Sequence, residues 1–363
     1  MKSLWWAQIK AVIRLEIKKT FFARRGLWIY FLAALPILLF AGYAILSAGQ
    51  HHRSLSLAGQ GEKSLTYQDL SAVRTGMTKE QVIGILGKPR LTSRWSEPRK
   101  EGKELIAHED YQYSDGQNRL YLGLADGRVV SMHLQEAYNL ADDATLFAGV
   151  FQFFFLRLAV FFGCLGIFMN LFRGEVLDRS LHFYFLAPIR REVLMTGKFV
   201  AGLLATCAIF VSSELLQNVA FLWDLPPGLR DTYLYHNHGL EHAAVYVLVT
   251  VLACLGYGAF FLVAGMFFRN PILPTAGILI WEAANPFLPP VLKHFSVIYY
   301  LKALCPVDIP VPPNTSPLMA LLISNSDPVS PPLALLGILL VASLALYVSS
   351  LQVRRMEINY TTE

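Results

Sequence analysis

The sequence predicts an all-α polytopic membrane protein of six transmembrane helices, with a small α+β domain inserted between the first and second helices. Hydrophobic residues make up 54% of the 363 residues and charged residues only 16%, whereas a soluble domain usually carries about a quarter charged residues. The apolar residues gather in runs of about twenty, the length that crosses a hydrocarbon core of about 30 Å. Residues 49–146 are the exception, because they are polar and mixed in charge.

Six apolar runs are the predicted spans, and the segments between them define the rest of the chain. The predicted spans are residues 27–48, 147–171, 199–222, 243–267, 272–291 and 332–351. The other parts are an amphipathic segment (1–26), the insert (49–146), and a tail (352–363). Within 147–351, the two loops of interest are a charged loop (173–198) and a proline-rich loop (292–331).

The distribution of Lys and Arg predicts the orientation of these spans. With the N-terminus inside, the short cytoplasmic segments hold fifteen basic residues and the short outer loops hold three. Basic residues accumulate on the cytoplasmic side, so we expect both termini in the cytoplasm and the insert outside it. The 27–48 run is longer than the core of a signal peptide, which favours an uncleaved anchor in the inner membrane of a bacterium. The net charge of +5 follows from this bias and does not indicate a nucleic-acid partner.

The residues before the first span predict a helix that lies in the headgroup layer of the membrane. Ile9, Ile13 and Ile17 share one helical face, with basic residues on a neighbouring face, the pattern of an interfacial amphipathic helix. The alternative is a basic flank that serves only insertion.

The insert at 49–146 predicts a small module with one clear helix and a pair of hairpins. In TGMTKEQVIGILGKP, Thr78 takes the N-cap position and Gln81 the capping-box position, while Gly87 and Pro89 end the helix. The residues that follow alternate between apolar and polar, with DGQN and ADGR as turns.

This module resembles the BamE-type (SmpA/OmlA) family of small outer-membrane-assembly lipoproteins. The likeness covers about 65 residues. It rests on a strand pair that ends near Val130, and on Gly76, Met77, Thr78, Val82, Leu86, Gly87 and Pro89. No cysteine precedes the module to carry a lipid, so the resemblance implies a fold and contacts with an envelope protein rather than outer-membrane residence. An ordinary helix-and-hairpin spacer is the alternative.

The charged loop 173–198 predicts an element that binds a partner. Pro188 lies within the loop and cannot continue a helix, so we expect an extension of the second span, a break at Pro188, and a short helix leading into the third span. The aromatic group HFYF (182–185) is too apolar to face water without a reason. A short amphipathic element of this kind fits a groove on a partner protein.

The loop resembles that of ABC-2 type transporter permeases. The family shows an acidic residue, a Ser/Thr-Leu pair, a proline, an Arg-Glu pair and a Gly-Lys pair in that order. The matching positions here are Glu175, Ser180-Leu181, Pro188, Arg191-Glu192 and Gly197-Lys198. The six-span layout, the N-terminal helix and the basic end QVRRME are similar too. Ser180 departs mildly from the family, which often has Thr there.

The resemblance implies a permease subunit that exports a substrate by alternating access, paired with a second permease chain as a homo- or heterodimer. Its coupling residues toward a separate ABC ATPase would be Glu175, Asp178, Ser180, Pro188, Arg190, Arg191, Glu192 and Lys198. The chain has no GxxxxGK[ST] motif, so we expect ATP and Mg in the partner ATPase and neither cofactor nor catalysis in this chain. The alternative is a basic loop that only fixes topology.

Polar residues inside the predicted spans are candidates for a translocation path or a dimer contact, because burying a charge in lipid costs roughly 2.5–3.5 kcal/mol. They are Arg157, Glu214, Gln217, Asn218, Glu282 and Asn285. Glu214, Gln217 and Asn218 form an i, i+3, i+4 stripe on the third span that should face protein or a cavity. The alternative is an interhelical hydrogen bond, either Arg157–Glu214 or Arg157–Glu282.

Two further segments carry expectations. In HNHGLEH, zinc could be held by His236, His238, Glu241 and His242, which would make the protein an intramembrane metalloenzyme. The HExxH motif is absent, and the alternative is that these are polar residues that cap the outer end of a span.

In the proline-rich loop, FSVIYYLKAL (295–304) is apolar enough to lie on the outer membrane surface. A membrane-anchored envelope interaction protein that acts through 49–146 remains a second hypothesis for the whole chain.

Overall fold

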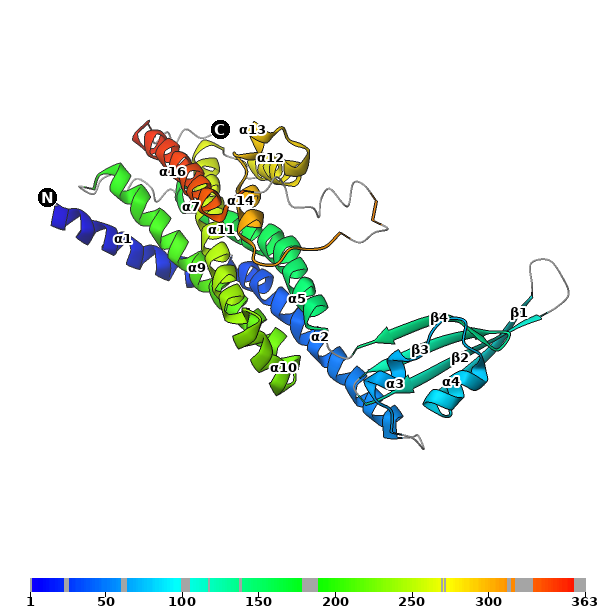
Figure 1. Cartoon of the computed structure of the whole chain (residues 1–363). Helices are drawn as coiled ribbons and strands as arrows, with labels where there is room; N and C mark the ends of the chain where they lie inside the picture. The colour runs from blue at the N-terminus through cyan, green and yellow to red at the C-terminus, as the bar shows by residue number, and fades with distance from the viewer. Residues whose placement is uncertain are drawn as a thin grey trace. The chain divides into compact units, whose positions relative to one another are not determined.

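The computed structural model describes most of the chain and divides it into two compact units. The described residues are 2–22, 26–59, 64–98, 105–116, 118–136, 139–177, 189–268, 270, 272–311, 315–316 and 329–355. The helical unit comprises 1–40, 144–222 and 226–363, and the sheet unit comprises 41–143 and 223–225. Figure 1 shows the helices of the first unit and the sheet of the second.

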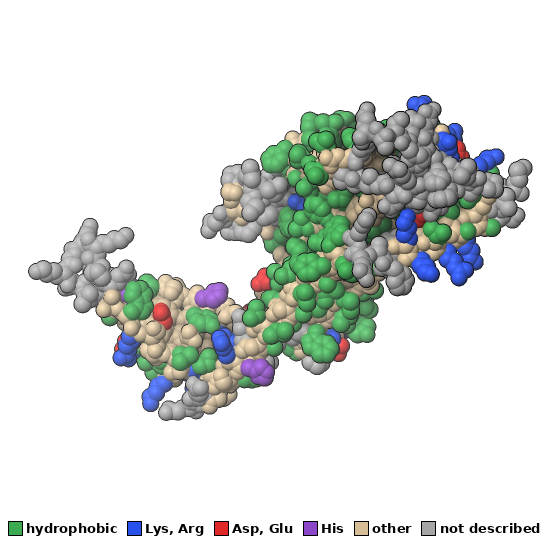
Figure 2. All heavy atoms as spheres, turned by 180° about the vertical axis from the view of Figure 1, so that it is seen from behind, with side chains coloured by type: hydrophobic (Ala, Val, Ile, Leu, Met, Phe, Trp, Pro, Cys, Tyr) green, Lys and Arg blue, Asp and Glu red, His purple; other side chains and the backbone are tan. Residues whose placement is uncertain are grey.

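Five described helices are long and apolar enough to cross a membrane, and each contains one of the predicted spans. They are α2 (Leu27–Gly59), the run Leu140–Phe172, α9 (Arg191–Asp224), α11 (Gly239–Phe267) and α16 (Pro331–Arg355). The run joins α5 (Leu140–Gly149), the π-helix η2 (Val150–Val160), α6 (Phe161–Phe168) and the start of α7 (Asn170–Leu177). Large apolar side chains, Leu38 and Leu340 among them, are exposed on these helices, and Figure 2 shows hydrophobic side chains covering them. These exposed apolar side chains on long helices indicate an integral membrane protein.

The predicted fifth span at 272–291 is wrong as a continuous helix. α12 (Ile272–Ala283) has 12 residues, a rise of about 18 Å, which is too short for a core of about 30 Å. The 3-10 turn η4 (Asn285–Phe287) and the short helix α13 (Pro290–Lys293) follow it. Three prolines in this stretch, at positions 286, 289 and 290, explain the interruption, because proline has no backbone N–H to continue a helix.

The segment FSVIYYLKAL also differs from its prediction, because its helix is buried rather than laid on a surface. α14 (Val297–Leu304) has six consecutive residues, 297–302, with at most 6% exposure. It packs closely on two long helices: a Cβ placed at Gly256 of α11 would lie 2.9 Å from Val297, and one placed at Gly337 of α16 would lie 2.2 Å from Tyr300. Glycine at these two positions is therefore what lets α14 approach α11 and α16.

The ends of several helices meet at one end of the helical unit. A Cβ at Gly265, near the end of α11, would lie 2.7 Å from the Met169 carbonyl oxygen, just after α6. Lys198, in the second turn of α9, donates a hydrogen bond to the Leu171 carbonyl at 3.1 Å. The ends of α6 and α11 and the beginning of α9 are therefore neighbours. Two short elements, α10 (Pro227–Asp231) and η3 (Thr232–His236), connect α9 to α11.

The sheet unit confirms the predicted α+β module. Its four described strands are antiparallel in the order β1 (Leu91–Pro98), β2 (Leu105–Ser114), β3 (Arg119–Ala125), β4 (Arg128–Gln135). Two helices, α3 (Tyr67–Ser71) and α4 (Lys79–Leu86), complete it. The core is made of Leu65, Leu70, Val73, Val82, Leu86, Tyr111, Tyr113, Leu120, Leu122, Leu124 and Val129. β1 and α3 were not predicted from the sequence.

The predicted capping box of α4 is confirmed in both directions. The Thr78 side chain accepts a hydrogen bond from the Gln81 backbone N–H, and the Gln81 side chain accepts one from the Thr78 N–H at 3.0 Å. Gly87 then ends the helix with a φ of 75°, a conformation that glycine adopts without steric cost.

Glu109 of β2 links the sheet to α4 through Lys79 and also accepts a hydrogen bond within its own strand. Lys79 Nζ donates to Glu109 Oε2 at 2.7 Å, and the Tyr111 hydroxyl donates to the same oxygen. Both hydrogen bonds lower the pKa of the Glu109 carboxyl, and the one from Lys79 has the larger effect. The charged carboxylate is therefore favoured in the folded unit.

We expect acid to loosen the sheet unit through Glu109. Its pKa is lower in the folded unit than in the unfolded chain, so its contribution is present above the unfolded pKa, about 4.3, and is lost as the pH falls through the folded value. Glu109→Gln should cost about 1 kcal/mol at pH 7. Hydrogen–deuterium exchange of the β2 and β3 amides in the full-length protein, corrected for intrinsic rates, should lose more protection on acidification in the wild type than in the variant. Equal losses would contradict this expectation.

Candidate functional site

α1 (Lys2–Phe22) is held against the start of α9 by a buried ion pair. Lys198 Nζ lies 2.6 Å from Glu16 Oε1, and the two side chains are 0% and 3% exposed. The same ammonium donates to the Leu171 carbonyl, and it lies 5.5 Å from the centroid of the Phe172 ring. One lysine therefore joins α1, α7 and α9.

The close approach of α1 and α9 depends on Gly197. A Cβ at this position would lie 2.9 Å from Cγ1 of Val12, and Val12 and Glu16 are the buried residues of the described face of α1. The isoleucines 9, 13 and 17 of the predicted apolar face are only half-buried, and the contact of α1 with α9 through Val12 and Glu16 was not predicted. The sequence does contain a sign that Glu16 is unusual: it is the one acidic residue in 1–25, and it falls among the apolar positions of the helix.

The end of the charged loop is also tied to the end of α16. Arg191 Nη1 donates to the Arg354 carbonyl at 2.9 Å, and Arg354 Nε lies 2.5 Å from Glu192 Oε1. Arg190 places its guanidinium 4.9 Å from the ring centroid of Trp5 in α1. Of the predicted coupling residues, Arg190, Arg191, Glu192 and Lys198 therefore lie together, where α1, α9 and α16 meet. Figure 2 shows Lys and Arg side chains gathered toward this end of the helical unit.

The other predicted coupling residues are only partly covered by the structure. α7 extends the second span to Leu177, as predicted, and includes the backbone of Glu175. The side chain of Glu175 lies outside the described residues, and so do Asp178, Ser180, Pro188 and the HFYF group. The predicted helix after Pro188 is the first part of α9, which begins at Arg191.

Glu282 joins the interrupted helices α12 and α14. Its carboxylate accepts hydrogen bonds from the Ser296 hydroxyl at 2.9 Å and from the backbone N–H groups of Val297 and Ile298 at 3.0 and 2.8 Å. A helix start carries unsatisfied N–H groups and a partial positive charge, so this buried carboxylate caps α14. Glu282 lies in the electrostatic surroundings of Arg157, but neither predicted hydrogen bond, Arg157–Glu214 or Arg157–Glu282, is formed among the described residues, and Arg157 Nε has no partner there.

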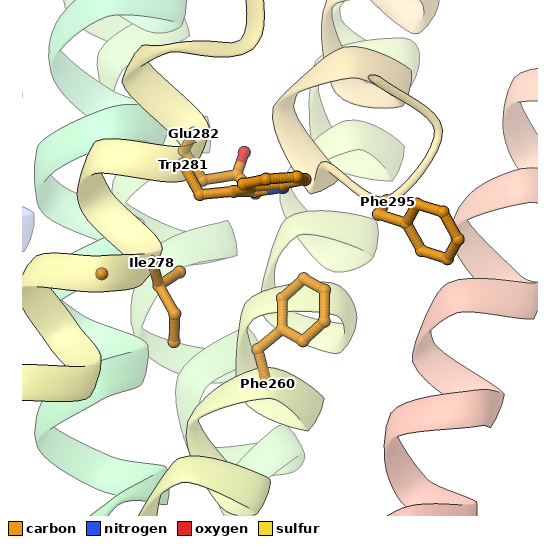
Figure 3. Close-up of a pocket in the computed structure, with 6 residues that line it drawn as sticks. Phe260, Ile278, Trp281, Glu282 and Phe295 are labelled. Atoms are coloured by element: carbon orange, nitrogen blue, oxygen red, sulfur yellow. The ribbon is translucent and has the colours of Figure 1, made fainter. Parts of the chain in front are cut away.

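An apolar hollow of about 340 Å³ lies beside Glu282. Its lining residues are Phe260, Gly277, Ile278, Trp281, Glu282 and Phe295. Figure 3 shows the Ile278 and Trp281 side chains of α12 and the Phe260 ring of α11 around one space. Close by in the sequence, Asn285 is also buried, and its Nδ2 has no hydrogen-bond partner within the described ranges.

Glu214 and Gln217 of the polar stripe on α9 are buried and Asn218 is half-buried, in line with the expectation that the stripe faces protein. Asn218 donates through Nδ2 to Oε1 of Glu214. Gln217 Nε2 donates to Ser213 Oγ at 3.2 Å, and Ser213 donates to the Ala33 carbonyl of α2 at 2.5 Å. Glu214 and Gln217 are 0% exposed, yet Glu214 Oε2 and Gln217 Oε1 have no hydrogen-bond partner in the described part of the chain.

The HNHGLEH residues do not form a grouped set of metal ligands. His238 Nδ1 lies 2.9 Å from Glu241 Oε2, and both side chains are largely exposed. His236 is exposed and His242 is half-buried. Among the described residues, no three His, Cys, Asp or Glu side chains are gathered as a metal site would require. His238 is the N-cap of α11 by position, with a left-handed backbone, and its side chain makes no hydrogen bond to the start of the helix.

Comparison with known proteins gives one finding, and it concerns the sheet unit. Residues 63–99 match the model of the outer membrane protein assembly factor BamE domain. This segment contains α3, α4 and β1, and it supports the resemblance drawn from the sequence of the insert. No curated protein and no solved structure matches the chain.

We expect the Glu16–Lys198 pair to be important for stability as a pair. Lys198→Met leaves a buried carboxylate without its cation and should destabilise the helical unit by about 3–5 kcal/mol. Adding Glu16→Met removes both charges and should restore most of that loss, since packed apolar residues can replace a buried pair. Thermal unfolding of the full-length protein in nanodiscs measures both effects. A double variant no more stable than Lys198→Met would contradict this expectation.

Proposed function

We propose that the chain is the membrane-spanning permease subunit of an ABC-2 type exporter in the inner membrane of a bacterium. Two permease chains would associate with a separate ABC ATPase, which binds ATP and Mg and drives alternating access. This chain would conduct the substrate and would not catalyse a reaction.

The observation that carries the proposal is that the end of the 173–198 loop is bonded to both α1 and α16. Arg191 and Glu192, which match the Arg-Glu pair of the family, contact Arg354 of α16. Lys198, which matches the Gly-Lys pair, is paired with Glu16 of α1. A displacement of the loop by a partner would therefore reach α1, α9 and α16 together, which is what coupling to an ATPase requires.

The arrangement of helix ends supports six crossings of the membrane in this proposal. The end of α16 contacts the beginning of α9, and the end of α11 lies beside Met169, also near the beginning of α9. If α11 and α16 both end on the cytoplasmic side, the chain between them must cross back once. α12 and α14, held together by Glu282, would supply this crossing in two short pieces.

A second candidate function is that of a membrane-anchored envelope interaction protein. The BamE match at residues 63–99 favours it, because it implies contact with a protein of outer-membrane assembly. In this case the sheet unit would be the functional part, and the end of the 173–198 loop would be free to vary. The sheet unit would lie on the extracytoplasmic side under both hypotheses.

We expect the tagged full-length protein, purified in mild detergent, to carry an ATPase with a Walker motif, identified by mass spectrometry. Arg190→Glu with Arg191→Glu should reduce its recovery at least tenfold, because the charge reversal disrupts the contacts to Trp5 and Arg354. Arg53→Glu with Arg128→Glu carries the same change of charge in the sheet unit and should leave recovery unchanged.

The same experiment separates the two candidate functions. Recovery of an outer-membrane assembly protein without any ATPase, from both the wild type and the Arg190/Arg191 variant, would refute the permease proposal and favour the second candidate. Loss of an assembly protein only in the Arg53/Arg128 variant would locate that contact on the sheet unit.

A further inference from the structure

We propose that the helical unit contains a binding site for a monovalent cation between α9 and α11, with oxygens of Glu214, Gln217 and Tyr246 as ligands. The site goes beyond the transport function proposed above, and it can be tested without an ATPase. It rests on three buried oxygen atoms that lack hydrogen-bond partners among the described residues and on aromatic contacts that join the helix faces carrying them through Phe147.

The buried face of α9 directs Glu214 and Gln217 toward the helix run 140–172. Phe210, Glu214, Gln217 and Phe221 follow one another at spacings of four, three and four residues, so they share one helical face. The ring contacts of the two phenylalanines show which elements this face packs against. The Phe210 ring lies 6.1 Å from the Phe155 ring of η2. The Phe221 ring lies 5.4 Å from the Phe147 ring of α5.

Tyr246 of α11 approaches the same place from the other side. Its ring lies 5.1 Å from Phe147 and 4.5 Å from Phe151, so Phe147 contacts both Phe221 and Tyr246. The Tyr246 hydroxyl is an electrostatic neighbour of Glu214. The residue is 1% exposed, and its hydroxyl has no hydrogen-bond partner among the described residues.

Three buried oxygens without a partner are costly, since each loses its hydration without a replacement. They are Glu214 Oε2, Gln217 Oε1 and the Tyr246 hydroxyl. The basic side chains of the neighbouring cluster lie near other groups: Arg157 has Tyr257 and Glu282 in its electrostatic surroundings, and Lys302 has Cys305, while the two cations repel each other. A bound cation would provide a common partner for the three oxygens and a counter-charge for Glu214.

The ligand chemistry selects a hard monovalent cation. A carboxylate, an amide and a phenol are oxygen ligands, which suit hard cations, whereas transition metals prefer imidazole or thiolate. Glu214 brings one formal negative charge, so Na⁺ leaves the buried site neutral and a divalent ion would not. A proton on the carboxylate, with water bridging the other oxygens, satisfies the same chemistry.

The titratable groups around the site are few. The Tyr246 hydroxyl has Tyr233 of η3, Cys305 after α14 and Glu214 as electrostatic neighbours, and His242 lies one turn before it on α11. From α2, the neighbouring groups are the Ala33 carbonyl that accepts from Ser213 and the Tyr30 side chain, which lines the same hollow as Ser213. A pH response of the site must therefore be assigned with variants of Glu214.

The test is the Na⁺ dependence of thermal unfolding of the full-length protein in nanodiscs, with choline chloride holding the ionic strength constant. At a saturating concentration, Na⁺ should raise the Tm of the wild type by roughly 5 °C. Glu214→Gln, which keeps the shape but not the charge, should abolish this shift, and Tyr246→Phe should weaken Na⁺ affinity at least tenfold. Glu282→Gln is the matched control: it should lower the Tm in both salts and retain the Na⁺ shift.

A second arm identifies a proton as the occupant. If Na⁺ has no effect, the Tm of the wild type in choline should fall as the pH rises above the carboxyl pKa of the unfolded chain, about 4.3, because the unfolded chain then releases a proton that the buried carboxyl keeps, and Glu214→Gln should remove that fall. If neither Na⁺ nor pH distinguishes the wild type from Glu214→Gln, the proposal is overturned. Should Glu214→Gln fail to fold, unchanged Na⁺ and pH responses in Tyr246→Phe would overturn it instead.

Discussion

The need to satisfy the first N–H groups of α14 inside an apolar interior is the constraint on which the helical unit depends. Without water, an unpaired backbone donor is costly, and a chain can be interrupted there only where the protein supplies acceptors. Glu282 supplies them for Val297 and Ile298. The break between α12 and α14 is thereby tolerated, α14 packs between α11 and α16, and Arg157 has an acidic group in its surroundings.

Three buried carboxylates of this unit meet the same physical problem in different ways. Glu16 is neutralised by Lys198, and Glu282 is solvated by a hydroxyl and two backbone donors. Glu214 has Asn218 on one oxygen and no described partner on the other. The first two fit the role of joining helices. The third departs from the rule that buried polar atoms are paired, and departures of this kind usually mark sites with a function.

What could be predicted from the sequence depended on local patterns, and what could not depended on distant contacts. The Thr78 capping box and the turns of the hairpins are set within a few residues, and the structure confirms them. β1 was missed because LTSRWSEP has little apolar alternation and is specified by pairing with β2. The burial of Glu16 depends on a lysine 182 positions away. The fifth span was predicted to be too long, because the apolar run was treated as one helix although prolines interrupt it.

The π-helix η2 has a consequence for how the chain can change in evolution. A π-helix closes its hydrogen bonds across five residues instead of four and so accommodates an additional residue. Removing one residue from Val150–Val160 would let the run return to α-helix with little rotation of the flanking helices, because the wider turn is what accommodates the additional residue. Phe147 in the flanking α5 would then keep its present neighbours, whereas side chains inside η2 would turn relative to theirs. Length changes, which are normally confined to loops, could thus alter the interior of this span.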